Sequence, residues 1–374
     1  MHVLRIDEHS PFRQLVGVGG LGTGMFFALL GDHTLGRNES RLGSLLDVRD
    51  YCKLHIVMHY VAKLLGASRG QFPVVPIGKV GDDVAGAFVL REMRTVGIDT
   101  RFVEVMTGKP TLFSVCFQYP DGTGGNITTG DSAAAELSEQ DIDLAESLFQ
   151  SVGPRTIALL VPEVPLACRK HFLVAASQKG AFSAASFVSG EIADAKRLGI
   201  FDQLSLVSLN EEEAADLVGE AFTPGSPEVF LDRLFRLVAL TYPQLAVVMS
   251  VGKNGAYFID RSGWSHSPAP RVEVASTAGA GDCLLGGVLA AMAAGVSLPD
   301  FRRRVTTDPL LENALDFGVL LASYKVSSPH TIHPHASLGE LLRFAERLGV
   351  TVVPEIEQLV SETEIVKTSQ LIQS

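Results

Sequence analysis

The sequence predicts an α/β protein with three layers, in which helices cover both faces of a mostly parallel central sheet. Short apolar runs of strand length alternate with longer segments of helical spacing along most of the chain. The 374 residues are 46% hydrophobic and 20% charged, which is enough apolar material for a large core. Several strand-like runs end directly in polar or glycine-rich residues, as parallel strands do at a ligand crevice.

The elements of the main body follow in order along the chain. Residues 14–30 are expected to form a short strand, a glycine turn and an apolar segment. We expect further strands at 72–80, 156–161, 181–187, 204–209 and 246–251, with short ones at 272–274 and 350–353. Helical spacing is found at 47–66, 84–96, 165–178, 211–218, 227–240, 310–326 and 340–349.

Residues 102–129 depart from this alternation of strands and helices. It alternates apolar and polar residues like antiparallel hairpins. We therefore expect a small antiparallel β lid beside the main sheet, with strands from about 30–50 and 102–130. An apolar lid face would be buried against a second copy, so we expect a homodimer through the lid.

The remaining chain organisation is simple. Residues 1–330 are expected to form one domain and 331–374 a C-terminal extension that packs on or beside it, with a polar, peripheral tail from 355. The net charge of −11 disfavours nucleic-acid and membrane partners. Four scattered cysteines are typical of reduced thiols in a cytoplasmic protein. The most apolar segment, 283–296, is too short to span a bilayer.

The strongest chemical signal lies in 272–295, where a short strand, the turn Gly279-Ala280-Gly281 and a helix follow one another. Such a helix start directs unpaired N–H groups and a positive dipole end at one point, which favours an anion. Asp282 in the first turn could take the proton of a hydroxyl while the turn holds the charge. The alternative is a structural helix whose aspartate caps its own turn.

A second candidate follows the strand at 204–209. Asn210 and Glu213 are three residues apart at a helix start, and oxygen ligands of this kind suit Mg²⁺. A helix cap with an acidic first turn explains the same residues equally well.

A third candidate follows the strand at 246–251. Ser250, Gly252, Lys253 and Gly255 offer a hydroxyl, backbone N–H groups and an ammonium to nucleotide phosphates. The alternative is a tight turn of the kind that Asn-Gly favours.

Two weaker patterns are also present. Gly17-x-Gly19-x-x-Gly22 matches a nicotinamide-cofactor fingerprint, but the strand before it has barely three apolar residues. The acidic candidates Asp32 and Glu39 lie in a polar stretch with no second strand, so glycines allowing close approach are the favoured interpretation. Histidines at metal-ligand spacing lack accompanying carboxylates or cysteines, and a helix face and a connector are favoured for them: His55 and His59, and His330, His333 and His335.

Taken together, these pieces resemble the ribokinase-like, or PfkB, sugar and nucleoside kinases over about residues 15–328. The family signature D-T-x-G-A-G-D stands here as Ser276 to Asp282. The resemblance implies that Asp282 is the catalytic base, that Gly279 to Gly281 form the anion hole and that Thr277 lies on the nucleotide side.

Two further family motifs are recognisable. N-x-x-E matches Asn210 and Glu213, which implies Mg²⁺ and phosphate positioning. T-x-G-x-x-G matches Ser250, Gly252 and Gly255, which implies a nucleotide segment.

The departures from the family pattern concern the cation and the acceptor. Ser276 replaces an acid that in relatives helps hold an activating monovalent cation, which leaves potassium dependence open. The sugar-binding G-G-x-x-x-N is not recognisable at 51–57, and the early aspartate is missing near 21–24. Candidate acceptor contacts are Asp32, Asp47, Arg49 and Asp50.

The sequence therefore predicts an ATP- and Mg²⁺-dependent kinase that phosphorylates a hydroxyl of a small sugar-like molecule. The altered acceptor half leaves an alternative, a catalytically silent nucleotide- or sugar-binding regulator on the same fold. A nicotinamide-dependent oxidoreductase is a third and weaker hypothesis.

Overall fold

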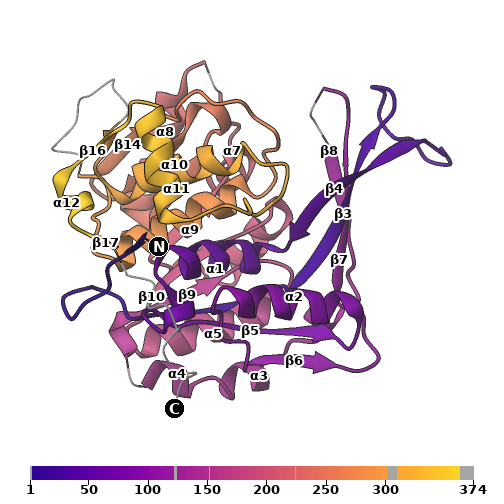
Figure 1. Cartoon of the computed structure of the whole chain (residues 1–374), viewed down its shortest axis with the longest axis horizontal. Helices are drawn as coiled ribbons and strands as arrows, with labels where there is room; N and C mark the ends of the chain where they lie inside the picture. The colour runs from indigo at the N-terminus through magenta and orange to yellow at the C-terminus, as the bar shows by residue number, and fades with distance from the viewer. Residues whose placement is uncertain (1, 122–123, 151, 224, 301–309, 363–374) are drawn as a thin grey trace, which may run out of the picture.

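A central sheet of nine strands organises the computed structural model, which describes residues 2–121, 124–150, 152–223, 225–300 and 310–362 (Figure 1). The strand order is β14-β13-β12-β11-β10-β9-β2-β5-β6. From β12 to β6 all neighbours pair in parallel, whereas β13 runs antiparallel to both of its neighbours. The bounds are β2 (Gln14–Val18), β5 (Val74–Gly81), β6 (Val103–Met106), β9 (Thr156–Leu160), β10 (Phe182–Ser186), β11 (Leu206–Leu209), β12 (Ala246–Ser250), β13 (Ala256–Asp260) and β14 (Gly263–Ser267).

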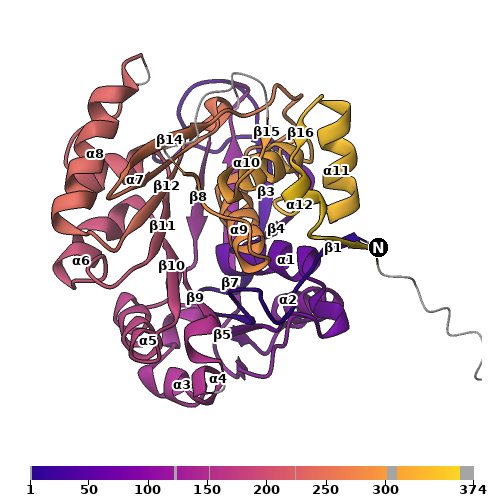
Figure 2. The same cartoon turned by 90° about the vertical axis from the view of Figure 1, so that its left-hand side faces the viewer.

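Helices cover both faces of this sheet, which confirms the three-layer α/β/α prediction (Figure 2). One face carries α1 (Lys53–Leu64), α2 (Val84–Thr95), α9 (Ala280–Ala293) and α10 (Ala314–Lys325). The other carries α3 (Glu139–Asp143), α4 (Ser147–Gln150), α5 (Leu166–Gln178), α6 (Ile192–Arg197), α7 (Glu211–Val218) and α8 (Pro227–Thr241). Each face has its own buried apolar cluster, so the sheet separates two cores.

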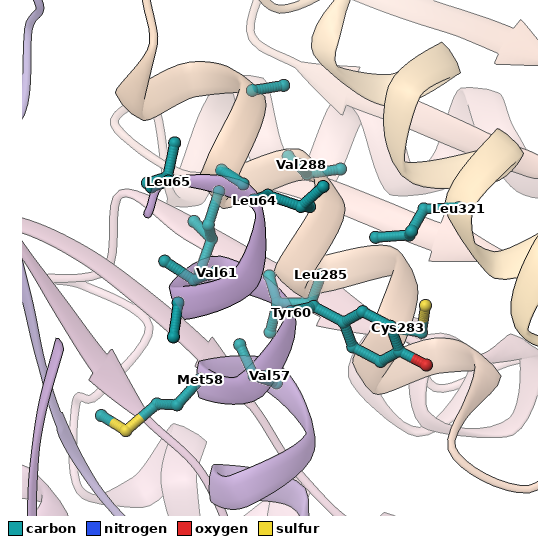
Figure 3. Packing of buried hydrophobic residues seen from close by; sticks show 14 of the residues in the cluster. Val57, Met58, Tyr60, Val61, Leu64, Leu65, Cys283, Leu285, Val288 and Leu321 are labelled. Atoms are coloured by element: carbon teal, nitrogen blue, oxygen red, sulfur yellow. The ribbon is translucent and has the colours of Figure 1, made fainter. Parts of the chain in front are cut away.

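The packing of α1 on α9 positions the site described below. Val57, Tyr60 and Val61 of α1 face Leu285 and neighbouring side chains of α9 (Figure 3). Gly286 makes the close approach possible, because a Cβ there would lie 3.0 Å from the carbonyl oxygen of Val57. Both helices begin at the same end of the sheet, so their first turns lie side by side.

A lid projects from the main body (Figure 1). It is a four-stranded sheet in the order β4-β3-β7-β8, with β3 (Gly22–Leu29), β4 (Gly43–Tyr51), β7 (Leu112–Gln118) and β8 (Gly124–Thr128). The central pair β3 and β7 is parallel, so the lid is mixed and not purely antiparallel.

Three sequence predictions about this region are corrected by the structure. The lid begins at Gly22 and not near residue 30. The helix expected at 47–66 begins only at Lys53, because residues 47–51 form the end of β4. The helical spacing of the apolar residues in α1 made the helix seem to start earlier. Val103–Met106 pairs with β5 at the edge of the main sheet and is not part of the lid.

The C-terminal extension packs on the core. The helix α11 (Leu338–Arg347) buries Leu341 and Phe344 against α10, and β15 (Leu310–Leu311) pairs with β16 (Thr351–Val352). The segment from 355 is not peripheral as expected, since Ile356 in α12 (Pro354–Glu357) is 1% exposed. β17 (Val360–Glu362) pairs with β1 (His2–Leu4), and residues 363–374 lie outside the described residues.

Three smaller observations complete the description of the fold. The short strand expected at 272–274 is not formed, and β14 ends five residues earlier, at Ser267. Among the residues that the structure describes, no helix is long and apolar enough to cross a membrane. The four cysteines are free thiols.

Candidate active site

The site lies where the strand order of the sheet reverses. The chain builds outward from β2 through β5 to β6, and then returns to β9 on the other side of β2. Ligands of open α/β sheets bind at the carboxyl ends of strands at such a switch point. Gly20 follows β2 and Glu163 follows β9, and a Cβ on Gly20 would lie only 2.4 Å from the Cβ of Glu163.

This close approach accounts for the glycine-rich segment after β2. A Cβ on Gly19 would lie 2.2 Å from the side chain of Val161, so the glycines allow the two strand ends to meet. The strand β3 follows this segment directly, whereas a nicotinamide fingerprint requires a helix there. The structure therefore contradicts the nicotinamide hypothesis for Gly17 to Gly22.

The turn predicted at Gly279 to Gly281 is present at the start of α9. Gly279 is the N-cap residue with φ 75°, in the left-handed region. The N–H of Ala280 donates to the carbonyl of Thr277 at 3.0 Å and so closes the turn. In a helix that begins here, the N–H groups of Gly281 and Asp282 have no intrahelical carbonyl partner and stand at the positive dipole end. These two groups, more than that of Ala280, are the donors an anion would meet.

Asp282 is 8% exposed and has a cationic neighbour that the sequence did not reveal. The Nζ of Lys53, the first residue of α1, lies 3.6 Å from Oδ1 of Asp282. The Asp282 carboxylate is the main cause of a raised Lys53 pKa, and Glu213 and Glu163 contribute in the same direction. The Lys53 ammonium therefore forms an ion pair with Asp282 and also interacts electrostatically with Glu213 and Glu163.

Glu163 and Asp50 bring further carboxyl groups to the site. Burial raises the pKa of Glu163 to about 7, and its Oε2 is buried with no hydrogen-bond partner among the described residues. Glu163 also has φ 76°, a strained value for a residue with a side chain. Burial raises the pKa of Asp50, at the end of β4, to about 6, with the Asp282 charge contributing in the same direction.

Of the four acceptor candidates, the structure brings only Asp50 to this place; Asp32, Asp47 and Arg49 are exposed on the lid. Sequence reasoning missed Lys53 and Glu163. Glu163 carried only a weak signal, because it lies in the loop after the parallel strand β9 and not directly at the strand end, as Asn210 does after β11. Lys53 carried no such signal, since its role depends on the packing of α1 against α9.

Asn210 and Glu213 cap α7 reciprocally. Asn210 Oδ1 accepts from the Glu213 N–H at 2.8 Å, and Glu213 Oε2 accepts from the Asn210 N–H at 3.0 Å. Glu213 is nonetheless 7% exposed, and burial raises its pKa while Lys53 lowers it. Its Oε1 is not used by the cap, so one hard carboxylate oxygen remains for a Mg²⁺ ion or a water bound to it.

The loop after β12 has the glycine geometry of a tight turn. Gly252 and Gly255 have φ 54° and 96°, and a Cβ on Gly255 would lie 2.0 Å from the Ser267 carbonyl oxygen. The side chain of Ser250 donates to the Leu209 carbonyl at 3.5 Å. Beside Lys253 lies a hollow of about 400 Å³, lined by Phe222, Pro227, Val251, Asn254, Tyr257, His266, Pro268 and Ala269.

The histidine patterns do not form a metal site. No group of three or more histidine, cysteine or acidic side chains within the described residues is arranged to hold a metal ion. His55 is completely buried in the packing face of α1, and burial lowers its pKa well below the ordinary range. His333 stacks on Tyr324 with ring centroids 4.2 Å apart. These observations favour a helix face and a connector.

An α/β sheet with a β lid over an anion turn and a buried acid defines a class of phosphotransferases that act on hydroxyl groups. Residues 57–338 match the pfkB family carbohydrate kinases, and the chain belongs to this family. It is 23% identical to a ribokinase of Dictyostelium discoideum over 220 residues, which are 56% of this chain and 68% of that protein.

Solved structures share the fold. A ribokinase of Cryptococcus neoformans in complex with ADP has a TM-score of 0.68 at 19% identity, covering 89% of this chain and 99% of that one. A nucleoside kinase of Burkholderia thailandensis in complex with inosine has a TM-score of 0.66 at 17% identity, covering 90% and 98%. At these identities the structures establish the common fold.

Proposed function

We propose that the protein transfers the γ-phosphoryl group of ATP to a hydroxyl of a small sugar-like molecule. The observation that carries this proposal is the position of Asp282. This buried carboxylate lies in the first turn of α9, beside the N–H groups of Gly281 and Asp282 itself, and within 3.6 Å of the Lys53 ammonium. A proton acceptor and an anion site at one point are what this transfer requires.

In this mechanism Asp282 takes the proton of the acceptor hydroxyl as its oxygen attacks the γ-phosphorus. The N–H groups of the turn stabilise the charge on the transferred group, and the ion pair with Lys53 orients the Asp282 carboxylate. Mg²⁺, held near Glu213 and Asn210, would neutralise charge on the phosphates when bound. Gly279 and Ala280 act indirectly, because they set the direction of the turn.

The acceptor side of the site is proposed to include Asp50 and Glu163. Carboxyl oxygens in a buried setting accept hydrogen bonds from sugar hydroxyls, and Glu163 Oε2 has no protein partner among the described residues. The names of the relatives, a ribokinase and a nucleoside kinase seen with inosine, support a ribose-like acceptor.

The nucleotide side is proposed to include Ser250, Gly252, Lys253, Gly255 and Thr277. No heavy atom lies within 4 Å of a Cβ built on Gly252, so a phosphate can approach the backbone there. The neighbouring hollow of about 400 Å³ has aromatic and proline walls suited to a purine base, and its volume is ordinary for a ligand site.

A homodimer through the lid is also proposed. The strand registers place Ile127 opposite Val115, Val115 opposite Met25, and Leu45 opposite Phe27, which puts these apolar side chains on one face. Ile127 and Leu45 are 70% and 63% exposed. A double variant with Leu45→Asp and Ile127→Asp is expected to sediment as a monomer where the unaltered protein sediments as a dimer.

The free thiols are consistent with a cytoplasmic location.

The central test is a panel of sugars and nucleosides assayed for ADP release with Mg·ATP. Asp282→Asn keeps the shape of the side chain and removes the base, so turnover of the best acceptor should fall about 10²–10⁴-fold. Asp216→Asn, on the exposed side of α7, is the matched control and should leave turnover unchanged. Equal rates for Asp282→Asn and the unaltered protein would exclude this mechanism.

The altered acceptor half supports one second candidate, a nucleotide- or sugar-binding regulator. Its signature in the same panel is a thermal shift with Mg·ATP without turnover of any acceptor.

A further inference from the structure

Lys325 is a charged side chain buried completely inside the protein. It is the last residue of α10 and is 0% exposed. Its Nζ donates to the backbone carbonyl of Ser276 at 3.1 Å. Among the described residues no carboxylate lies within ion-pair distance of this ammonium. Burial of a charge without a direct counter-ion is costly, and it lowers the pKa of Lys325 to about 8.

The ammonium is held at the base of the anion turn. The N–H groups of Ala275 and Ser276 donate to the carbonyl of Val326 at 2.8 and 3.2 Å, and the Ser276 hydroxyl accepts from the N–H of Ala278 at 3.2 Å. The end of α10 and the segment that enters the turn are therefore one hydrogen-bonded unit. The Lys325 charge is attracted by the negative charges of Asp282 and Asp50, which both act to raise its pKa.

The residues around Ser276 do not fit a monovalent metal ion. The acid that the family signature has at this position is a serine here. The Ser276 carbonyl, a natural ligand for such an ion, is already bound by an ammonium. A second cation beside this ammonium would be repelled at short range in a site where screening by water is weak.

We propose that the Lys325 ammonium is a built-in replacement for an activating monovalent cation. It fixes the Ser276 carbonyl and the turn that follows, and its protonated form supplies a positive charge behind the anion site. The enzyme is accordingly independent of potassium. Lys325 is a positioning residue, since it acts through the turn and not on the substrate. This inference rests on the proposed function only in taking the turn as the phosphoryl site.

The first experiment uses the unaltered protein. Phosphoryl transfer and the thermal unfolding midpoint are measured in potassium, sodium and tetramethylammonium chlorides at equal ionic strength. We expect the same rate and the same midpoint in all three salts. Activation of several-fold by potassium, or a midpoint that rises only in potassium, would overturn the proposal.

The second experiment uses Lys325→Met, which keeps the chain length and removes the charge. Turnover should fall on the order of tenfold or more, as when one charge-stabilising contact is lost. Potassium or ammonium ions should restore part of this loss and raise the unfolding midpoint of the variant, whereas tetramethylammonium should do neither. Unchanged turnover, or a loss that no small cation restores, would show that Lys325 serves packing alone.

Lys79→Met is the matched control. Lys79 is also a buried lysine, but it forms ion pairs with Glu104 and Asp141 away from the turn. Small cations should not rescue this variant. Because the midpoint measurements need no turnover, they decide the role of Lys325 even if no acceptor is phosphorylated. That last result would count against the proposed function and not against this inference.

Discussion

The replacement of Gly279 by alanine tests the geometry on which the site depends. Gly279 has φ 75°, and a left-handed conformation costs a residue with a Cβ about 1–2 kcal/mol. The new Cβ would also lie 2.8 Å from the carbonyl oxygen of Thr331 and 3.3 Å from Cδ1 of Ile56. Thr331 cannot retreat easily, because its N–H donates to the carbonyl of Arg49 at 3.1 Å.

The expected loss of stability is the sum of the left-handed backbone strain and the steric clash with Thr331. Overpacking typically adds about 1–3 kcal/mol, so Gly279→Ala should destabilise the protein by about 2–5 kcal/mol in total. At about 2 °C of unfolding midpoint for each kcal/mol, the midpoint should fall by about 4–10 °C. Turnover should fall as well, since any relief of the clash moves the turn that carries Asp282.

Gly281→Ala is the matched control, two residues further along. No heavy atom lies within 4 Å of a Cβ at Gly281, and its φ is not positive. Because alanine is favoured over glycine in a helix, stability should be unchanged or higher by up to about 1 kcal/mol. Turnover should nevertheless fall, because the new methyl group points into the open space where the phosphates are proposed to lie.

Thermal unfolding and ADP release are measured on both variants. A midpoint for Gly279→Ala equal to that of the unaltered protein would refute the left-handed turn and its contact with Thr331. Full activity of Gly281→Ala would refute the placement of phosphates at this turn.

Three further predictions concern charged groups. Lys53→Met removes the cation beside Asp282 and should lower kcat on the order of 100-fold; kcat equal to that of the unaltered protein would place Lys53 outside the reaction. The Glu163 pKa of about 7 in the fold exceeds its ordinary 4.5, so its stabilising contribution is present below pH 4.5 and lost as the pH rises through 7. Glu163→Gln should therefore flatten the decline of stability between these pH values in urea titrations, and an identical decline would contradict the assignment. Glu191→Gln leaves the guanidinium of Arg169, which is 1% exposed and lies 2.5 Å from Glu191, without its counter-charge. It should cost about 3 kcal/mol in urea unfolding, and a loss near zero would mean that the pair is not a buried one.

Local sequence patterns were enough to predict most helices and strands of the fold. The helix α7 spans the residues expected for it, because a reciprocal cap at Asn210 begins it and Gly219, in the left-handed region, ends it. The turn at the start of α9 was predicted equally well, since glycines directly before a helix-forming segment are enough to indicate it.

The pairing of strands that are far apart in the sequence could not be predicted from local patterns. β3 was expected as an apolar segment after a turn, and it became a lid strand because it pairs with β7, about ninety residues later. For the same reason the sequence did not predict that Lys53 and Glu163 lie near Asp282. Lys53 lies at Asp282 through helix packing, and Glu163 approaches β2 through two glycines. These contacts join residues far apart in the sequence, so no local sequence pattern indicates them.

The pairing of β1 with β17 also constrains how the chain folds during synthesis. Val3 and Leu4 are synthesised more than 350 residues before residues 360–362, the strand with which they pair. At ordinary rates of translation that interval is roughly 20–70 s. During this interval β1 has no partner strand, so the pair can form only after residue 362 has been synthesised. Until then β1 is an unpaired strand, and an unpaired strand edge is open to aggregation or chaperone binding in the nascent chain.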